Sequence, residues 1–182
     1  FLGLDNRGGT RTATEHLLSL GHRRIAFYGG HADSSSCRER RLGYQDALRE
    51  AGIVFDEGWM IETVPTRLAA SAHAGALCAI DPAPTAAVCY NDAVALGLML
   101  GLARLGRHPG IDFAVTGFDD IPEAAVGIPP LTTMSADPRA RGRQAAELLL
   151  QRAANPSPLP RRSVVVDVQL TRRESTPHVF AS

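Results

Sequence analysis

The stretch Val115-Thr-Gly-Phe-Asp-Asp-Ile121, followed after a short loop by Pro129-Pro-Leu-Thr-Thr133, indicates the class of fold. It begins with a short apolar run typical of a buried strand, and Asp119 comes directly after that run. In an open α/β sheet, ligands bind in the crevice beyond the carboxyl ends of the strands. We therefore expect the carboxylate of Asp119 to lie at a ligand site.

The same arrangement occurs twice more upstream of this stretch. Asn91 follows one apolar run, and Ser34, Ser36 and Arg40 follow another. Because the carboxyl ends of parallel strands share one edge of a sheet, these polar groups are predicted to converge there.

Apolar strands alternate with amphipathic helices along most of the chain. The predicted strands are 1–4, 24–28, 60–64, 85–89, 113–117, 131–134 and 164–170, and the predicted helices are 10–20, 37–51, 68–80, 92–105 and 138–153. Such alternation implies right-handed crossovers and a parallel sheet with helices on both faces. The sequence thus predicts a doubly wound α/β domain. The first strand end and helix have too few strands around them to close a core, so part of a second lobe is expected upstream of Phe1.

Composition restricts the class of protein. The 182 residues are 45% hydrophobic, which is enough for a sizeable core, and 19 basic residues balance 19 acidic ones. No basic face therefore points to nucleic acid binding by this chain itself. The three cysteines show neither a disulfide framework nor a metal-ligand spacing, so a reducing cytoplasm is the expected compartment. No run of about 18 apolar residues and no signal peptide appears, so no membrane span is predicted.

Each candidate site residue also has a purely structural interpretation. Asp119 could cap a turn, although Asp120 beside it is the more natural capping partner. Asn91 is a favourable helix N-cap, but Asp92 could take that role and leave the amide of Asn91 for a ligand.

The polar residues around the second predicted helix have the same two interpretations. Arg40 lies early in that helix, where its planar guanidinium could hold two oxygens of a ligand, whereas an exposed arginine is usually just solvated. Ser34 and Ser36 could cap the helix or donate to a ligand. His16 and His22 flank the end of the first helix, where local polar contacts are expected.

No motif for catalysis or for a cofactor is present. The sequence contains no nucleophile elbow, no Walker loop, no His-Glu-x-x-His pair and no recognisable Cys-His arrangement. Gly29-Gly30 lacks the third glycine of a dinucleotide fingerprint. We therefore predict binding without chemistry: no enzyme activity, no cofactor and no metal.

The chain resembles the effector-binding domain of the LacI/GalR family of bacterial transcriptional regulators, whose core has the type I periplasmic-binding-protein fold. The segments that carry the resemblance follow the family order and are Asp5-Asn6 with Gly9-Thr10, His16-Leu17, Leu20-Gly21-His22-Arg23-Arg24-Ile25-Ala26, Arg40 with Gly43-Tyr44, Pro84-Thr85-Ala86, Asn91-Asp92 with Ala95 and Gly97, Gly117-Phe118-Asp119-Asp120, and Pro129-Pro-Leu-Thr-Thr133. The leucine-glycine-histidine-arginine segment and the final Pro-Pro-Leu-Thr-Thr distinguish these regulators from periplasmic solute receptors.

The resemblance implies two lobes joined by three crossovers, a ligand in the cleft between them, and a homodimer formed through the effector domains. It divides the chain into a remnant of the N-terminal lobe (1–20), the C-terminal lobe (21–131), a return segment to the N-terminal lobe (132–154), and a return to the C-terminal lobe with a tail (155–182). Only part of the N-terminal lobe is then present.

The resemblance also assigns site residues. Arg40, Asn91 and Asp119 match the main polar ligand contacts of the family, and Ser34 with Ser36 match the turn that lines the pocket. This set suits a sugar or another polyol, since hydroxyls satisfy both arginine donors and carboxylate acceptors.

One departure from the family concerns the ligand. Family members often place an aromatic ring in the loop after the third strand, where this chain reads Val64-Pro-Thr-Arg-Leu68. Without that ring, stacking on a sugar face or a purine is weaker.

The implied function is that of a cytoplasmic regulator. A small effector, such as a sugar or sugar derivative, would favour one interlobe angle and so modulate operator DNA binding. Operator DNA would be bound only through an N-terminal helix-turn-helix that this sequence does not contain. The alternative is a solute-binding receptor of a sugar transport system, which shares the fold and the cleft.

Overall fold

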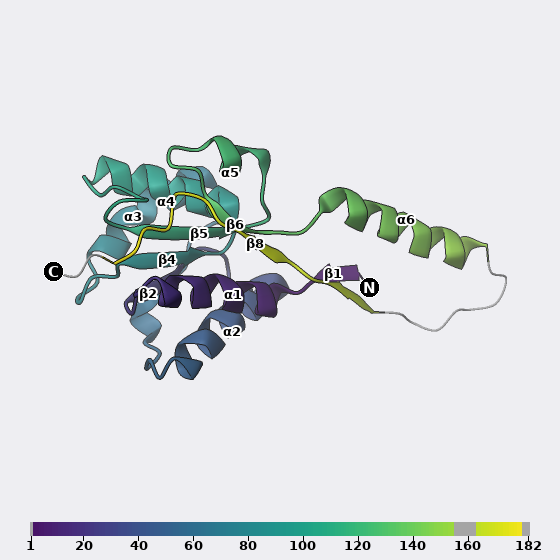
Figure 1. Cartoon of the computed structure of the whole chain (residues 1–182), viewed down its shortest axis with the longest axis horizontal. Helices are drawn as coiled ribbons and strands as arrows, with labels where there is room; N and C mark the ends of the chain where they lie inside the picture. The colour runs from purple at the N-terminus through teal and green to yellow at the C-terminus, as the bar shows by residue number, and fades with distance from the viewer. Residues whose placement is uncertain (1, 155–162, 180–182) are drawn as a thin grey trace.

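A computed structural model describes residues 2–154 and 163–179 as a six-stranded sheet covered by helices and a separate two-stranded sheet (Figure 1). The larger sheet has the order β3 (Met60–Ile61), β2 (Ile25–Tyr28), β4 (Ala86–Cys89), β5 (Ala114–Phe118), β6 (Thr132–Ser135) and β8 (Gln169–Thr171). The smaller sheet pairs β1 (Leu2–Leu4) with β7 (Val164–Val166). All strand pairs are parallel except β6 with β8, which is antiparallel. The predicted doubly wound α/β class is confirmed, with one antiparallel edge strand added.

The helices form two layers, one on each face of the larger sheet. On one face α1 (Asn6–Ser19) lies beside α2 (Ser35–Glu50), and on the other α3 (Arg67–Cys78) lies beside α4 (Asp92–Arg104) (Figure 1). The short helices η1 (Glu57–Trp59) and α5 (Pro122–Val126) lie in connections, and α6 (Pro138–Ala153) follows β6.

Both faces of the central strands are buried. In β2, Phe27 belongs to the core beneath α1 and α2, whereas Tyr28 belongs to the core beneath α3 and α4. Neighbouring side chains of a strand point to opposite faces, so a strand with two covered faces must be apolar throughout. This explains the continuous apolar runs in the sequence.

Glycines allow the helices of each layer to approach closely. A Cβ atom added at Gly43 of α2 would lie 2.1 Å from the carbonyl oxygen of Arg7 in α1, and one at Gly97 of α4 would lie 2.4 Å from the carbonyl oxygen of Arg67 in α3. The backbones of paired helices therefore touch where these residues lack a side chain.

The first helix begins earlier than predicted. It starts at Asn6 rather than at residue 10, because Oδ1 of Asp5 accepts a hydrogen bond from the backbone N–H of Gly8 at 2.8 Å and caps the first turn. Gly8 and Gly9 are poor helix formers, so helix propensity alone did not predict this turn. Asp5, a good N-cap residue, was the feature of the sequence that indicated the earlier start.

The predicted strand 164–170 is wrong in one respect, because it is two strands. β7 pairs with β1 in the smaller sheet, and β8 pairs with β6 in the larger one. The predicted strand 60–64 is also shorter, since β3 ends at Ile61. The proline-rich stretch 156–160, part of the predicted return to the C-terminal lobe (155–182), lies outside the described residues.

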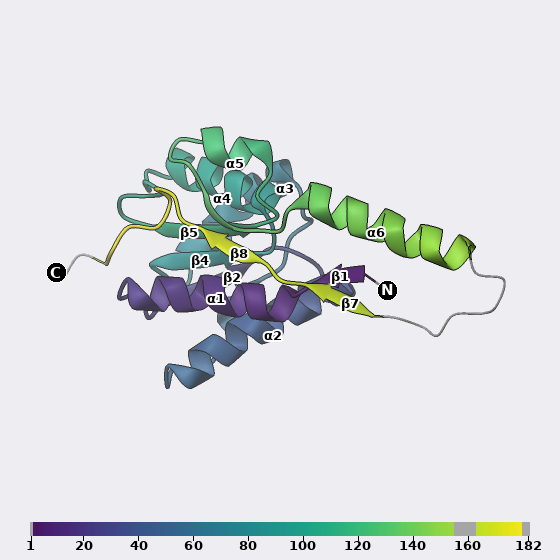
Figure 2. The ribbon, with the colours of Figure 1, turned by 45° about the vertical axis from the view of Figure 1, so that its right-hand side comes forward.

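The lobe boundaries at residues 20 and 131 stay predictions, and the structure shows where the chain passes between the two sheets. β1 lies in the smaller sheet, but α1 packs on α2 and buries Ala13 and Leu17 against the body of the larger sheet. β6 is hydrogen-bonded to β5, so the chain leaves the larger sheet only after Ser135. Figures 1 and 2 show α6 extending away from this sheet, on the same side as the β1–β7 pair.

Two histidines hold the segment that follows β8. Nε2 of His16 lies 3.0 Å from Oγ1 of Thr176, while His22 contacts Oγ1 of Thr85 at 2.9 Å and the carbonyl oxygen of Pro177 at 3.0 Å. Burial lowers the pKa of both imidazoles. The polar contacts predicted for these histidines exist, but they join residues far apart in the sequence.

The helices of ranges 2–154 and 163–179 include none that is both long and apolar enough to cross a bilayer. Within the same ranges, no three side chains of histidine, cysteine, aspartate or glutamate are grouped so that they could hold a metal ion.

Candidate functional site

Arg40 lies at the carboxyl edge of the larger sheet and joins three segments of the chain. Its Nε donates to Oδ1 of Asn6 at 2.8 Å, its Nη1 donates to the carbonyl oxygen of Tyr90, and its Nη2 donates to Oδ1 of Asp119 at 3.3 Å. The guanidinium carbon lies 3.7 Å from the ring centroid of Phe118 and 5.0 Å from that of Tyr90. Because Tyr90 and Asp119 directly follow β4 and β5, the guanidinium crosses the ends of the two central strands.

The environment of Arg40 is that of a buried charge, not of a solvated surface arginine. The residue is 5% exposed. Burial lowers the pKa of its guanidinium, and the nearby Asp119 carboxylate acts in the opposite direction. A buried charge is tolerated only when it is paired and hydrogen-bonded, as this one is. Arg40 therefore organises the site as well as being a candidate ligand contact.

Asp119 is held in an unusual backbone conformation. Its φ is 109° and that of Asp120 is 53°, both in the region that favours glycine. Such strained backbone conformations persist only where surrounding contacts hold them in place, and they cluster at functional sites. Here the N–H of Asp119 donates to the carbonyl oxygen of Met134 at 2.9 Å, and Oδ1 of Asp120 accepts from Nη2 of Arg173 at 2.7 Å. The predicted capping role of Asp120 is replaced by this ion pair, and the side chain of Asp119 stays 40% exposed.

The predicted division of roles between Asn91 and Asp92 is wrong. Oδ1 of Asn91 accepts from the N–H of Val94 at 2.9 Å and caps α4, whereas Asp92 points into the protein. Oδ1 of Asp92 accepts from the hydroxyl of Thr133 at 2.5 Å, and its Oδ2 accepts from the N–H of Ile121 at 2.9 Å. Asn91 can cap because its backbone is extended at the start of the helix. Asn91 can still offer its amide NH₂ group to a ligand, because the cap uses only its oxygen.

The two serines form a chain of hydroxyl groups. Ser34 caps α2 by accepting from the N–H of Cys37 at 3.4 Å, and its Oγ lies 2.9 Å from Oγ of Ser36. Oγ of Ser36 lies 2.9 Å from the hydroxyl of Tyr90. Ser36 thus reaches the Arg40 network through Tyr90, so both roles expected of the serines are chemically possible.

An open pocket of about 600 Å³ adjoins this network. It is lined by Leu4, Asp5, Asn6, Arg7, Ser35, Ser36, Glu39 and Val165, which come from the smaller sheet and the starts of α1 and α2. Asn6 and Ser36 therefore face the space between the two sheets. Asn91 and Asp119 do not line it, so only part of the predicted set opens onto this pocket.

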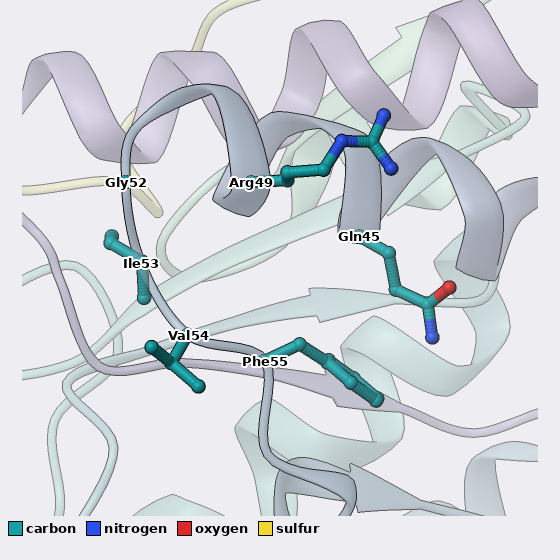
Figure 3. A pocket seen from close by; sticks show the side chains of 6 residues that line it. All are labelled: Gln45, Arg49, Gly52, Ile53, Val54 and Phe55. Carbon is teal, nitrogen blue, oxygen red and sulfur yellow. The ribbon is translucent and has the colours of Figure 1, made fainter.

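A second pocket, of about 460 Å³, lies at the other end of α2 (Figure 3). Its lining residues are Gln45, Arg49, Gly52, Ile53, Val54 and Phe55. α2 begins near the carboxyl edge of the sheet, so this pocket lies towards the opposite edge, away from every residue predicted for the site.

The structure brings Arg40 and Asp119 into direct contact and links Ser34 and Ser36 to them through one side chain. Asn91 is a neighbour in sequence of Tyr90, but its amide oxygen is directed to the first turn of α4. Sequence reasoning missed the roles of Tyr90 and Asn6. Tyr90 follows β4 directly, which is the same signal that pointed to Asn91.

We expect the buried carboxyl of Asp92 to make stability depend on pH. Burial raises its pKa from 3.8 to about 6, while the Thr133 and Ile121 hydrogen bonds oppose this change. The folded state therefore disfavours the ionised form, and the stabilisation present at low pH is lost as the pH rises through 6. The full effect is about 3 kcal/mol, of which about half falls between pH 5 and 8.

The variant Asp92→Asn should remove this dependence. An asparagine can keep both hydrogen bonds, because the Thr133 hydroxyl can reverse and accept. Urea unfolding from pH 5 to 8 should show the variant gaining stability relative to the wild type by about 1–2 kcal/mol. The exposed control Asp33→Asn should show no such trend. A constant difference between Asp92→Asn and the wild type at all pH values would mean that the carboxyl titrates normally.

Comparison with known proteins identifies the family. A profile described as periplasmic binding protein-like domain matches residues 14–176. The transcriptional repressor PurR of Vibrio campbellii is 38% identical over 144 residues, and that of Vibrio atlanticus is 40% identical over the same length; each match covers 79% of this chain and 43% of the relative. The chain thus spans less than half the length of these curated relatives.

Solved structures agree with this assignment. The regulator CelR in complex with cellobiose has a TM-score of 0.89 and 33% identity, covering 96% of this chain and 53% of its own. A LacI-family regulator from Enterococcus faecium with bound ribose has a TM-score of 0.89 and 27% identity, covering 98% and 65%. The chain therefore belongs to the periplasmic-binding-protein-like family and, within it, to the effector-binding domains of LacI/GalR transcriptional regulators.

Proposed function

We propose that the chain binds a small polar effector, a sugar or sugar derivative, at the carboxyl edge of its larger sheet, and that binding modulates the operator affinity of a cytoplasmic regulator. The main support for this proposal is the contact between buried Arg40 and half-exposed Asp119. Asp119 lies in a turn whose residues have positive φ. Such a turn aims a carboxylate outward from the strand ends, where open α/β sheets bind ligands.

The donors and acceptors at the site favour hydroxyl groups over a flat aromatic ligand. Asp119 offers carboxylate oxygens, Asn91 offers amide N–H groups, and Ser36 offers a hydroxyl. The ring of Phe118 is buried beneath the Arg40 guanidinium, so it provides no stacking surface. The cellobiose and ribose complexes of two structural neighbours support this ligand class.

The regulator proposal is favoured over a transport receptor because the relatives that match at 35–40% identity are named as transcriptional repressors. We further propose a homodimer. Val126 and Ile128, which flank Gly127 after α5, are 78% and 99% exposed. Leu68 of α3 is also exposed, and an ion pair of 3.2 Å between Arg67 and Glu123 places it beside α5. Exposed apolar side chains on neighbouring elements fit a self-complementary interface.

A thermal-shift screen of the full-length protein tests this function. We expect cellobiose, ribose or another sugar to stabilise the protein by about 2.7 kcal/mol at a hundredfold excess over Kd. Asp119→Ala should remove the shift, and the exposed control Asp112→Ala should keep it. Sedimentation velocity of the same samples should show a dimer. Stabilisation by purine bases alone would refute the sugar class, and a shift that survives Asp119→Ala would refute the site.

A further inference from the structure

The carboxylate of Asp92 joins three segments that meet at the carboxyl edge of the sheet. Asp92 is the first residue of α4 and follows Asn91 in the chain, while its two oxygens bind Thr133 on β6 and the N–H of Ile121. The residue is completely buried. A charged or polar group in such a place persists only if its hydrogen bonds are made, as both are here.

Gly117 on β5 provides the space for this carboxylate. A Cβ atom added at Gly117 would lie 2.1 Å from Oδ1 of Asp92 and 2.9 Å from Leu131. The carboxylate therefore fills the volume that a side chain of the central strand would otherwise occupy. This fit leaves it little freedom to take another orientation.

The segment held by Asp92 runs from the candidate ligand contact to the exposed apolar surface. Asp119 and Asp120 both have positive φ, and Ile121 follows them as the residue before α5. α5 ends at Val126, Ile128 follows after Gly127, and both of these apolar residues are exposed. Ile121, whose N–H is bonded to Asp92, therefore lies between Asp119 and α5 in the chain.

We propose that Asp92 is a positioning residue that couples occupancy of the effector site to the exposed face formed by α5, Val126 and Ile128. The coupling rests on the proposed function and extends it. Asn91 and Asp119 are both proposed effector contacts, and Asp92 joins the start of α4, which follows Asn91, to the N–H of Ile121, which follows Asp119 and Asp120. Movement of the start of α4 relative to the 119–121 turn thus changes the position of α5, where the partner subunit of the proposed homodimer would dock.

Hydrogen exchange of the ligand-free full-length protein tests the positioning role. In Asp92→Ala, amide protection in residues 119–128 should fall by about tenfold, the size expected for loss of one buried hydrogen bond to a charged group. Protection in β2 and β4 should stay unchanged. Asp92→Asn should retain the protection of the wild type, because it can keep both bonds, and the exposed Asp112→Ala should do the same. Unchanged protection of 119–128 in Asp92→Ala, or an equal loss throughout the domain, would overturn the proposal.

A second measurement tests the coupling with cellobiose as the probe. The dimer dissociation constant of the wild type and of Asp92→Asn should change on saturation with cellobiose, whereas that of Asp92→Ala should not. An equal change in Asp92→Ala would overturn the coupling. If the wild type binds no sugar at all, the proposed function fails, and the hydrogen-exchange result still decides whether Asp92 holds the 119–128 segment.

Discussion

Replacement of Arg40 by methionine is expected to destabilise the domain by about 3–5 kcal/mol and to abolish the effector response. Methionine fills much of the same volume, but it removes one cation from the Asp119 carboxylate and one donor from the Asn6 amide oxygen and the Tyr90 carbonyl oxygen. Each polar group left unpaired in a partly buried network costs about 1–3 kcal/mol, whereas the half-exposed Asp119 carboxylate keeps part of its solvation.

Urea unfolding and effector titration measure the two consequences separately. The control is Arg49→Met on the same helix, since Arg49 pairs with Asp46 at 2.5 Å but is 71% exposed. An exposed ion pair contributes about 1 kcal/mol or less, so this variant should unfold almost like the wild type. Arg40→Lys should fall between the two, because an ammonium group keeps the charge but cannot reach three partners in one plane. Equal stability of Arg40→Met and Arg49→Met would contradict the role of Arg40 as the centre of the network.

Replacement of Gly43 by alanine should destabilise the protein by about 3 kcal/mol, a value at the upper end for added volume in a close-packed interior. The added Cβ would lie 2.1 Å from the carbonyl oxygen of Arg7 and 2.9 Å from the backbone nitrogen of Arg11. Neither atom belongs to a flexible side chain, so α1 and α2 must move apart. Differential scanning calorimetry should show the melting temperature falling by about 6–12 °C.

The matched control for Gly43→Ala is Gly75→Ala in α3. Gly75 is helical and exposed, and a Cβ atom there would meet nothing within 4 Å. Alanine is a better helix former than glycine by about 1 kcal/mol, so this variant should raise the melting temperature. The same substitution is therefore expected to act in opposite directions on two helices. A rise in both variants would mean that α1 and α2 do not make the close backbone contact.

Much of the site was predictable because position along a strand decides where a residue lies. Asp119 and Asn91 follow apolar runs that had to be buried strands, so their place at the sheet edge followed from the α/β pattern. Arg40 lies one turn inside the helix after the preceding strand, which brings it to the same edge. What each residue does there was less predictable, because Asn91 and Asp92 are both good capping residues and only the fold determines which side chain faces inward.

The doubly wound fold follows from the sequence alone, because the alternation of apolar strands and amphipathic helices has few other ways to bury its apolar faces. The place of the polar residues at the strand ends follows from the same pattern. Three features depend instead on packing between distant segments: β7 and β8 join different sheets, Asp92 lies in the space left by Gly117, and Tyr90 and Asn6 complete the environment of Arg40. These features depend on contacts between residues 25 to 162 positions apart, where local periodicity carries no information, and packing volume and unpaired polar groups decide the outcome.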